Sequence, residues 1–509
     1  MSGKSLMLGI DLGTSSVKAL LLREDAQVER VASAPYTLHR SIDGTAEQDT
    51  NDWWHALRLC LGHLRAAGAS LNHISAIGLS GQMHGLITLD RAGQPLGTCH
   101  TWADTRSSAA LAELAARVDT VRLSSITGSG PYTSATVSKM LWMRANDPER
   151  WRRTAYVLLP KDEMRRRLTG VLATDPSDAS GTQLLDIGTR RWSDELLAAL
   201  DLSPGLLPPI LESAAIAGTL SRDAAHALEL SDGIPVVTGG GDAECAALGV
   251  GIDGGPEHAR TALISLGTAA QCFLAVNAPR IDPSGWLQTF CHVVPDHWHV
   301  MYPLLMGASA LDWLSGLTSP PSKVRVPAEA LLDDARMSPP GACGLIFLPY
   351  VDGMRVPVEV PTPQSAFVGL NARHSRADLA RAVVEGIAIS LDGGIRAAQA
   401  NGLATERIRL AGGGARHAIW AQTLADVTGL PVERCIAHDA SARGAALLAA
   451  QGVGARETVL RALEDSALVN EVSAPVTELS PLYQRKAAIT HDLLSTLRPA
   501  FRQIEANLS

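Results

Sequence analysis

The sequence lacks the features that mark several classes of protein. It contains no run of about 18 apolar residues, the length that a helix needs to cross a bilayer. Acidic residues outnumber lysine and arginine, and the formal net charge is -8, so no basic surface is expected for nucleic acid. We therefore predict a protein that binds neither membranes nor nucleic acid.

Paired cysteines are also missing. The seven cysteines are dispersed, and none stands in a CxxC pair: Cys60, Cys99, Cys245, Cys272, Cys291, Cys343 and Cys435. An odd, scattered set in a long chain is typical of buried, reduced thiols, not of a disulfide framework or a zinc site. The sequence gives no reason to expect an oxidising compartment.

The 509 residues, of which 46% are hydrophobic, are sufficient for two large domains. The first residues, MSGKSLMLGIDLG, contain only a short apolar stretch that leads into a turn. They predict a first strand and not a signal peptide, so we expect a cytoplasmic protein. Glycine and proline cluster at 249–259, which places the expected boundary between domains of residues 1–252 and 253–509.

The same hairpin pattern occurs twice. LMLGIDLGTSSVKALLL has Asp11, Thr14, Ser15 and Lys18 at or near its turn, and TALISLGTAAQCFLAV repeats the pattern with Gly267 and Thr268. A glycine followed by a hydroxyl residue allows the backbone to approach a phosphate and offers amides and a hydroxyl to bind it. Each turn alone is also compatible with an ordinary hairpin, with Thr as a strand former and Lys18 as a solvated side chain.

A single acid follows three glycines in VVTGGGDAE. Asp242 stands at the end of an apolar strand and before a helical stretch, AECAALGVG. A carboxylate there is suited to accept a proton from a hydroxyl that attacks a phosphoryl group. Asp is also a good N-cap, and the two roles are compatible. Asp11 has the analogous alternatives of binding Mg2+ or accepting hydrogen bonds from turn amides.

Two further segments end strands with glycine. ISAIGLSGQMHG predicts a buried strand that places Met83 and His84 at its carboxyl end, where α/β sheets bind ligands. RIRLAGGGARHAIW predicts a strand, a turn at Gly412, Gly413 and Gly414, and a helix from about Ala415, with amides suited to a nucleotide. We also predict a helix over 376–400, whereas 318–341 is proline-rich.

Together these motifs resemble those of carbohydrate kinases of the FGGY family, within the sugar kinase, Hsp70 and actin superfamily, and most of all the xylulokinases. The resemblance extends from Gly9 to about Ala450 and includes SGQMHG, LLPKDEMRRRLTG from Leu158 and TFCHVVPDHWHVM from Thr289. It implies an α/β protein of the actin-like ATPase (ribonuclease H-like) fold, with two duplicated domains around a nucleotide cleft. A homodimer is expected by family analogy alone.

The resemblance also implies residue roles. Asp242 would be the catalytic base, and Met83, His84, Trp102 and Asp104 would contact the sugar. ATP would be bound by Thr14, Ser15, Lys18, Gly267, Thr268 and the three glycines from Gly412, and Mg2+ would be bound at Asp11. The implied reaction is transfer of the γ-phosphoryl group to the terminal hydroxyl of D-xylulose, with lobe closure that excludes water.

Departures from the family pattern leave alternatives open. Ala103 and Ala243 stand where xylulokinases usually have asparagine, and Met354, Val356 and Val358 replace the usual residues of LPYVDGMRVPV. Because of these changes, the main alternative to a xylulokinase is a kinase for another ketopentose, a polyol or a sugar acid. An actin-like or chaperone ATPase is more remote, because the chain has the SGQMHG segment. His292, His297 and His299 suggest a metal site, but no acid or cysteine completes it.

Overall fold

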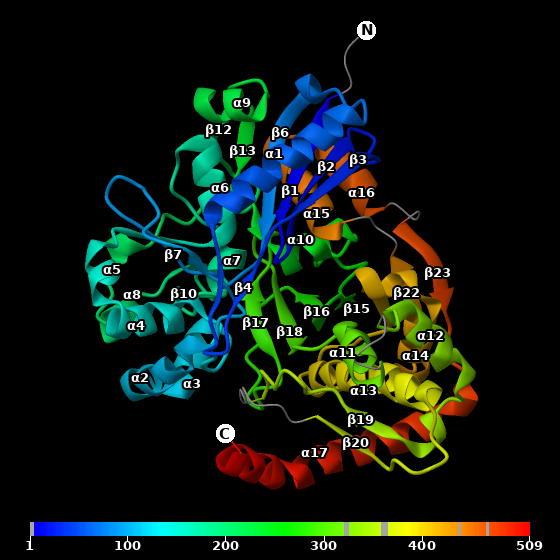
Figure 1. Ribbon diagram of the computed structural model, residues 1–509. Helices are drawn as coiled ribbons and strands as arrows, with labels where there is room; N and C mark the ends of the chain where they lie inside the picture. The colour runs from blue at the N-terminus through cyan, green and yellow to red at the C-terminus, as the bar shows by residue number, and fades with distance from the viewer. Residues whose placement is uncertain (1–4, 320–324, 358–364, 436–438, 465–467, 509) are drawn as a thin grey trace.

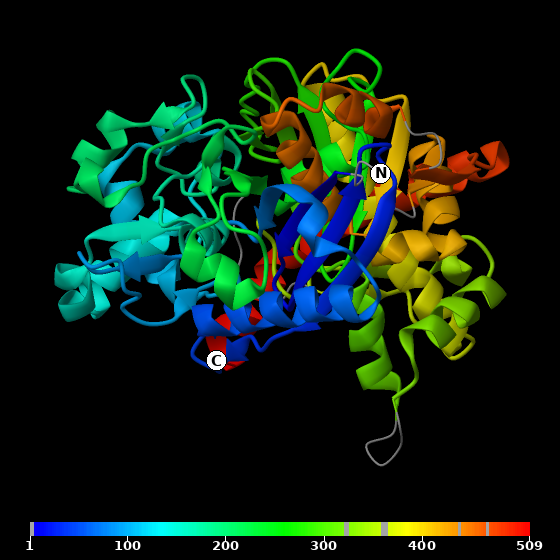
Figure 2. The ribbon, with the colours of Figure 1, turned by 90° about the horizontal axis from the view of Figure 1, so that it is seen from above.

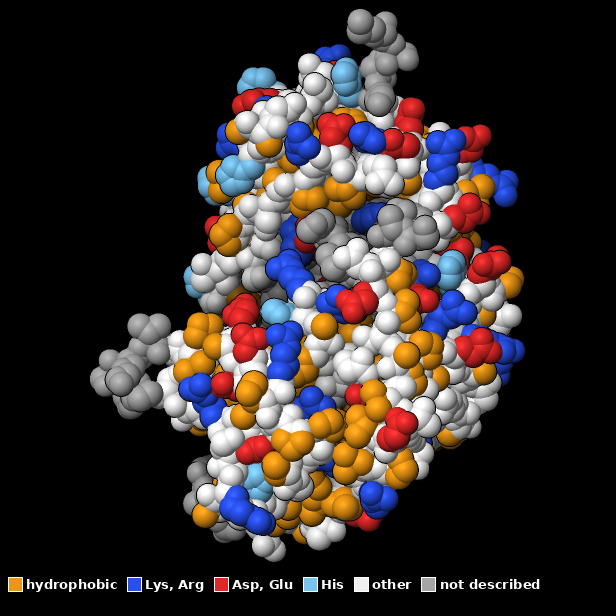
Figure 3. All heavy atoms as spheres, turned by 90° about the vertical axis from the view of Figure 1, so that its right-hand side faces the viewer, with side chains coloured by type: hydrophobic (Ala, Val, Ile, Leu, Met, Phe, Trp, Pro, Cys, Tyr) orange, Lys and Arg blue, Asp and Glu red, His pale blue; other side chains and the backbone are white. Residues whose placement is uncertain are grey.

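The computed structural model describes residues 5–319, 325–357, 365–435, 439–464 and 468–508. Two seven-stranded sheets form two lobes, one built mainly from the first half of the chain and one from the second (Figure 1). No helix in these described ranges is long and apolar enough to cross a membrane. On the face in Figure 3, acidic and basic side chains are interspersed.

The first sheet has the order β12-β13-β6-β1-β2-β3, and β14 also pairs with β6. Its strands are β1 (Leu6–Leu12), β2 (Ser16–Arg23), β3 (Val28–Pro35), β6 (Ile74–Gly81), β12 (Ile216–Thr219), β13 (Pro235–Val237) and β14 (Gly240–Gly241). β1, β2 and β3 are antiparallel, whereas β6 runs parallel to β1 and to β13. α1 (Thr50–Ala66) covers one face, because Trp53, Leu57, Leu61 and Leu64 share one side and are buried, as predicted.

A largely helical insertion separates β6 from β12 and projects from the side of the first lobe (Figures 1 and 2). Its helices are α2 (Ala110–Arg117), α3 (Thr120–Thr127), α4 (Thr136–Asn146), α5 (Pro148–Arg153), α6 (Pro160–Thr169), α7 (Pro176–Ser180) and α8 (Asp194–Ala199). Small sheets join β4 (His39–Arg40), β5 (Ala46–Gln48) and β8 (Cys99–His100); β7 (Ile87–Leu89) and β9 (Tyr156–Leu158); and β10 (Leu185–Asp186) and β11 (Arg191–Trp192). α9 (Arg222–Leu228) precedes β13.

The second sheet has the order β17-β18-β16-β15-β21-β22-β23. Its strands are β15 (Thr261–Leu266), β16 (Ala270–Val276), β17 (Gln288–Cys291), β18 (Trp298–Leu304), β21 (Arg407–Ala411), β22 (Val432–Cys435) and β23 (Val469–Ser473). Besides α15 (Ala440–Gly452), the α-helices of this half are α11 (Ser309–Thr318), α12 (Ala328–Met337), α13 (Arg376–Ala400), α14 (Ala418–Thr428), α16 (Arg456–Leu463) and α17 (Ser480–Leu508). β19 (Ile346–Leu348) pairs with β20 (Ala366–Val368) beside them.

Two helices cross where the lobes meet. α10 (Asp242–Gly249) packs against α15 (Ala440–Gly452), and α15 lies on β1 and β6 of the first sheet. Glycines allow this close approach: a Cβ on Gly444 would lie 1.8 Å from the carbonyl oxygen of Cys245, and one on Gly9 would lie 1.9 Å from that of Ala442. The helix α15 from the second half therefore completes the core of the first lobe.

Most predicted elements agree with the structure. The hairpins β1–β2 and β15–β16, the strand β6 and the helix α13 are confirmed. The interpretation of Asp242 as an N-cap is wrong, because Gly241 caps α10 and Asp242 is the first residue of the helix. The helix expected from about Ala415 begins at Ala418, after a 3-10 turn over Gly413–Arg416. The boundary at residue 252 stays a prediction.

Candidate active site

The first hairpin turn is held by a backbone bond and by side chains from other segments, among them Gln48 and Trp102. The amide of Gly13 donates to Ser16 O (3.1 Å) and closes the turn. Gln48 Nε2 donates to Thr14 O (2.6 Å), and the indole Nε1 of Trp102 donates to the Thr14 hydroxyl (2.9 Å). Trp102, predicted to contact the sugar, therefore lies directly beside the turn predicted to contact phosphate.

The second turn is packed against the start of α11. The amide of Gly307 donates to Thr268 O (2.7 Å), and that of Ala308 donates to Gly267 O (2.8 Å). Ser309 Oγ also donates to Thr268 O (2.6 Å). The turn is thus fixed by its carbonyl groups, and both predicted residues, Gly267 and Thr268, line a cavity between the lobes.

This cleft cavity has a volume of about 450 Å3. It is lined by both turns, by the predicted sugar and base residues Met83, His84, Trp102 and Asp242, and by Ala243, Arg40, Asp352 and Arg355. The first turn contributes Thr14 and Ser15. The structure therefore brings together two turns distant in sequence, the predicted base and three of the predicted sugar residues, Met83, His84 and Trp102. A volume of several hundred Å3 is the size of a small-molecule site.

Asp242 is the acid at the start of α10 that faces the cleft cavity. Its side chain is partly exposed there. Burial, and then the negative charge of Asp11, raise the pKa of Asp242 to about 7. A carboxylate with a pKa near neutrality is suited to accept a proton, because it is substantially ionised and still binds the proton well.

Asp11 lies at the end of β1 and is buried. Its Oδ1 accepts a hydrogen bond from Ser80 Oγ (3.0 Å). Burial raises the pKa of Asp11, whereas the positive charge of Lys18 and the Ser80 hydrogen bond lower it. Lys18 forms an ion pair with Asp439 at the start of α15, with Nζ and Oδ1 2.8 Å apart. Lys18 thus stands between acids of both halves of the chain.

The glycine turn before α14 packs against the end of β15. Gly412 has φ +86°, and a Cβ there would lie 2.7 Å from Leu266 O. A Cβ on Gly414 would lie 2.4 Å from Leu266 Cδ2, whereas one on Gly413 would meet nothing within 4 Å. None of the three lines the cleft cavity itself. The open space at Gly413 is compatible with a ligand above the turn, and the predicted nucleotide contact stays a prediction.

His84 follows β6 in a left-handed backbone conformation, with φ +69°. Its Nδ1 lies 2.9 Å from Gly181 O, and burial, followed by the charge of Arg355, lowers its pKa to about 3. The ring is therefore neutral, and donation from Nδ1 to the carbonyl leaves Nε2 as a hydrogen-bond acceptor. Such an acceptor facing a cavity is suited to a sugar hydroxyl.

Asp104 does not line the cleft cavity. It is buried, and its carboxylate accepts hydrogen bonds from Arg106 Nε (3.1 Å) and from the amide of Ala46 (3.1 Å). It does line an adjoining cavity of about 320 Å3, which it shares with Trp102, Ala103, Arg40 and Arg355. Its role as a sugar contact stays a prediction, and the paired carboxylate is better placed to hold the Trp102 loop.

Three charged residues of the cleft cavity were missed in the sequence: Arg40, Asp352 and Arg355. Asp352 and Arg355 belong to the segment 348–358, where the departure was noted. Met354 and Val356 are buried in the core of the second lobe and do not line the cleft cavity. Val358 lies outside the described residues. Lining and buried residues do not alternate regularly along this segment, so periodicity could not have identified Arg355.

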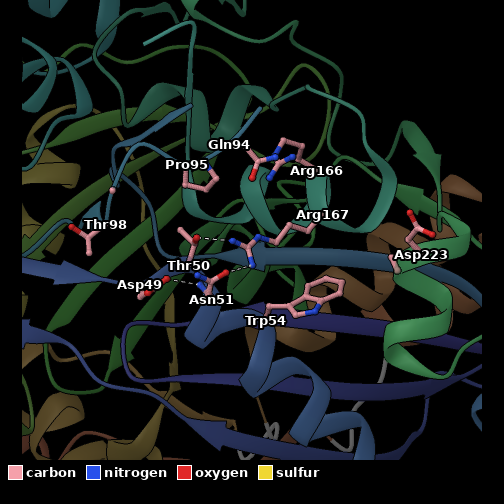
Figure 4. A pocket seen from close by; sticks show the side chains of 12 residues that line it. Asp49, Thr50, Asn51, Trp54, Gln94, Pro95, Thr98, Arg166, Arg167 and Asp223 are labelled. Atoms are coloured by element: carbon pink, nitrogen blue, oxygen red, sulfur yellow. Dashed lines mark hydrogen bonds between the residues drawn. The ribbon is translucent and has the colours of Figure 1, made fainter. Parts of the chain in front are cut away.

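Other candidate sites carry less chemistry. His292 and His299 are buried, and no group of metal ligands in the described ranges includes them. One such group, formed by Glu47, His100 and Asp104, already has Arg106 paired to both acids. A larger hollow of about 680 Å3 is lined by residues of α1, α6 and α9 and of the segment 94–98 (Figure 4). Its Arg167 is already bonded to Thr50 Oγ1 (2.7 Å) and Asn51 Oδ1 (3.1 Å).

Comparison with known proteins decides the family. Residues 6–249 match the N-terminal domain of the FGGY family of carbohydrate kinases, and residues 262–453 match its C-terminal domain. The chain belongs to the FGGY family of carbohydrate kinases. The two matched segments follow the two lobes, and both hairpin turns fall within them. The actin-like ATPase fold and the activity of a carbohydrate kinase are thereby confirmed for this chain.

This FGGY kinase is similar to several named relatives. It is 36% identical to the xylulose kinase of Escherichia coli K12 over 500 residues, which cover 97% of this chain and 99% of that one. It is 38% identical to the xylulose kinase of Klebsiella pneumoniae over 450 residues, covering 87% and 89% of the two chains. The crystal structure of a xylulose kinase from Brucella ovis has a TM-score of 0.88 and 33% identity, and covers 97% of this chain and 100% of that one.

Proposed function

We propose that this FGGY kinase transfers the γ-phosphoryl group of ATP to the terminal hydroxyl of D-xylulose and forms D-xylulose 5-phosphate. The observation that carries the proposal is Asp242, a carboxylate with a pKa of about 7 in a cavity lined by both hairpin turns. The substrate is inferred from relatives named xylulose kinase that match most of the chain. ATP is the phosphoryl donor throughout the family.

Asp242 would act as the general base. Its carboxylate accepts the proton of the C5 hydroxyl as that oxygen forms a bond to the γ-phosphorus. The bond from the γ-phosphorus to the oxygen that bridges to the β-phosphate breaks, and ADP leaves with this electron pair. The raised pKa supports the role, because a carboxylate with the usual pKa near 4 would hold the transferred proton weakly at neutral pH.

The two turns would bind the phosphates. Thr14 and Ser15 lie on one side of the cleft cavity and Gly267 and Thr268 on the other, so the γ-phosphate would lie between them. Lys18 would act through charge, since its ammonium is already paired with Asp439. The glycines from Gly412 onward would face the adenosine, and Gly413 has space on its side-chain face.

Mg2+ would be held at Asp11. Among the described residues, no group of three or more possible metal ligands includes Asp11. This arrangement fits Mg2+, which is usually bound by one or two carboxylates, water and substrate phosphates, and not by a closed protein cage. When bound there, the ion would neutralise phosphate charge. Ser80 Oγ keeps one carboxylate oxygen of Asp11 directed, which leaves the other for the ion or its water.

The sugar would lie between Met83, His84 and Trp102. The neutral His84 ring would accept a hydroxyl hydrogen bond at Nε2, and the Trp102 ring would offer an apolar surface to the carbon skeleton. Trp102 would also report on the nucleotide, since its indole nitrogen donates to Thr14 (2.9 Å). Ala243 lines the cavity where an asparagine is usual, so one polar contact to the sugar would be lost or supplied by another group.

A second substrate class is favoured by one observation. Arg40 and Arg355 both line the cleft cavity, as do the acids Asp352 and Asp242. Cationic side chains near the sugar end would tolerate an acceptor with a carboxylate, so a sugar acid is the alternative to a neutral ketopentose or polyol. The expected homodimer and cytoplasmic location stay predictions.

The test is ADP release with ATP and Mg2+ on a panel of D-xylulose, L-xylulose, D-ribulose, L-ribulose, glycerol and gluconate. We expect the highest kcat/KM with D-xylulose, by at least about tenfold, which corresponds to about 1.4 kcal/mol of transition-state binding. Nuclear magnetic resonance of the product should place the phosphate on C5. A preference for gluconate would instead assign Arg40 and Arg355 to a carboxylate and overturn the proposed substrate.

A further inference from the structure

The segment that delivers Asp242 to the cleft cavity is a turn of three glycines, Gly239–Gly241. A Cβ on Gly239, which has φ +82°, would lie 2.3 Å from Leu79 O. A Cβ on Gly240 would lie 2.2 Å from Val293 Cγ1, and one on Gly241 would lie 2.3 Å from Glu244 Oε2. The turn has no side chains that could fix it, so its position depends on bonds to its backbone.

Two buried side chains hold the two ends of this turn. Arg165 Nη1 donates to Thr238 O (3.0 Å), just before the first glycine. The amide of Gly241, next to Asp242, donates to Ser177 Oγ (3.0 Å). Both side chains come from the helical insertion, Arg165 from α6 and Ser177 from α7. They act in addition to the pairing of β14 with β6.

The two anchors are joined by a continuous set of buried ionic contacts, which we call the anchor network. Ser177 Oγ donates to Asp175 Oδ2 (2.5 Å), and Lys161 Nζ lies 2.9 Å from Asp175 Oδ1. Lys161 Nζ also lies 2.7 Å from Asp162 Oδ1, which in turn accepts from Arg165 Nη1 (2.9 Å). The LLPKDEMRRRLTG segment contains Lys161, Asp162 and Arg165. None of these three residues takes part in the proposed phosphoryl transfer itself.

The anchor network is fully buried, so its charges must compensate one another. The charge of Lys161 holds the pKa of Asp175 below its usual value in spite of burial. Asp178, 3.3 Å from Lys161 Nζ, has a pKa raised well above its usual value by burial. Lys161 is paired with both Asp162 and Asp175, and Arg165 is paired with Asp162. Such an arrangement is rigid, because displacing one group leaves a partner charge uncompensated.

The bond directions in the network fix the hydroxyl of Ser177. Asp175 is ionised and accepts only, so the hydroxyl proton of Ser177 points to Asp175. Its lone pairs therefore point to the amide of Gly241. Ser213 Oγ donates to the same Asp175 oxygen (2.8 Å) and keeps the carboxylate in place. The ionised Asp175 thus determines the donor in both hydrogen bonds of Ser177, which donates to Asp175 and accepts from the amide of Gly241.

We propose that Ser177, oriented by Asp175 and Lys161, is a positioning residue that fixes the Gly241 amide and thereby aims the Asp242 carboxylate into the cleft cavity. The inference rests on the proposed role of Asp242 as base. It assigns a purpose to the LLPKDEMRRRLTG segment, which supplies the ionic end of the anchor network. Ser177 touches neither substrate nor nucleotide.

The test compares Ser177→Ala with the matched control Ser180→Ala. Both serines are buried on α7, and each accepts a backbone amide, but Ser180 Oγ bonds Cys291 N (3.1 Å) and not the glycine turn. We expect Ser177→Ala to lower kcat by about 10- to 100-fold with both KM values within about threefold, because misplacement by about 1 Å has this effect. Ser180→Ala should retain kcat within about threefold.

Amide hydrogen exchange provides a readout that does not depend on the substrate. The peptide covering 238–242 should exchange faster in Ser177→Ala than in Ser180→Ala, while the rest of the first sheet stays protected. If D-xylulose is not the acceptor, the kinetic comparison uses the panel sugar that is turned over, and the exchange result still holds. Equal kcat losses in the two variants, or unchanged exchange at 238–242, would overturn the proposal.

Discussion

Lys18 of β2 and Asp439 at the start of α15 form an ion pair between segments 421 positions apart in the chain, with Nζ and Oδ1 2.8 Å apart. The pair lies where the second half of the chain packs onto the first sheet, next to Asp11. Lys18 lowers the pKa of Asp11, whereas Asp439 raises it. The ionic state of the predicted Mg2+ ligand is thus set jointly by both halves of the protein.

Removing the charge of Lys18 should weaken Mg2+ binding. In Lys18→Met the pKa of Asp11 rises further, because the attraction of the ammonium is lost while burial and Asp439 remain. We expect the Mg2+ concentration for half-maximal activity to rise several-fold, whereas Lys18→Arg should stay close to the wild type. An unchanged Mg2+ requirement in Lys18→Met would separate Lys18 from Asp11 and contradict this interpretation.

The rate should depend on the ionisation of Asp242. Its pKa of about 7 means that the carboxylate is protonated at pH 5.5 and cannot accept a proton, and that kcat/KM rises toward a plateau above pH 8. His84, with a pKa of about 3, stays neutral over this range and adds no second inflection. The measurement is kcat/KM from pH 5.5 to 9 at saturating Mg2+. A flat profile over that interval would show that Asp242 does not titrate there.

The same raised pKa predicts a pH-dependent stability difference. Between its unfolded pKa near 4 and its folded pKa of about 7, Asp242 binds a proton more readily in the folded state. Its ionisation therefore disfavours folding as pH rises through this window, and the penalty is complete above pH 7. Asp242→Asn should raise Tm at pH 8 by a few degrees, on the order of 2 kcal/mol after allowance for partial exposure, with little change at pH 4. A uniform shift at both pH values would argue against this origin.

At Gly444, the close contact between α10 and α15 should not tolerate any side chain. Gly444→Ala would place a Cβ 1.8 Å from Cys245 O, a backbone atom that cannot move without separating the helices. We expect loss of several kcal/mol of stability or failure to fold. The control Gly62→Ala lies in α1 with nothing within 4 Å of the added Cβ, and should stabilise by about 0.5–1 kcal/mol. Equal thermal shifts in the two variants would contradict the close packing.

The sequence predicted the elements that local patterns define. Glycine and hydroxyl residues between apolar strands identified both turns, and the helical period of Trp53, Leu57 and Leu61 identified α1. The anchor network was not predicted, because it joins Lys161, Asp175 and Gly241 through space. A buried lysine is indistinguishable from a solvated one in sequence.

Two further features of the structure could not be predicted from the sequence. Asp104 was interpreted as a sugar contact, but its pairing with Arg106 depends on a turn that sequence periodicity does not describe. The placement of α15 on the first sheet could not be predicted either. Helix α15 is formed by residues 440–452, far from that sheet in sequence. Its small residues allow the close packing on the sheet, but in the sequence they predict only a helix.

The central claim is that Asp242 accepts the proton of the sugar hydroxyl during phosphoryl transfer. The direct test is Asp242→Asn, which keeps the size of the side chain and removes its basicity, with kcat measured by ADP release and D-xylulose affinity by calorimetry. We predict that kcat falls by about 10²–10⁴-fold while the affinity for D-xylulose stays within a few-fold. Retention of kcat within about tenfold would contradict the account, because the sugar would then lose its proton without Asp242.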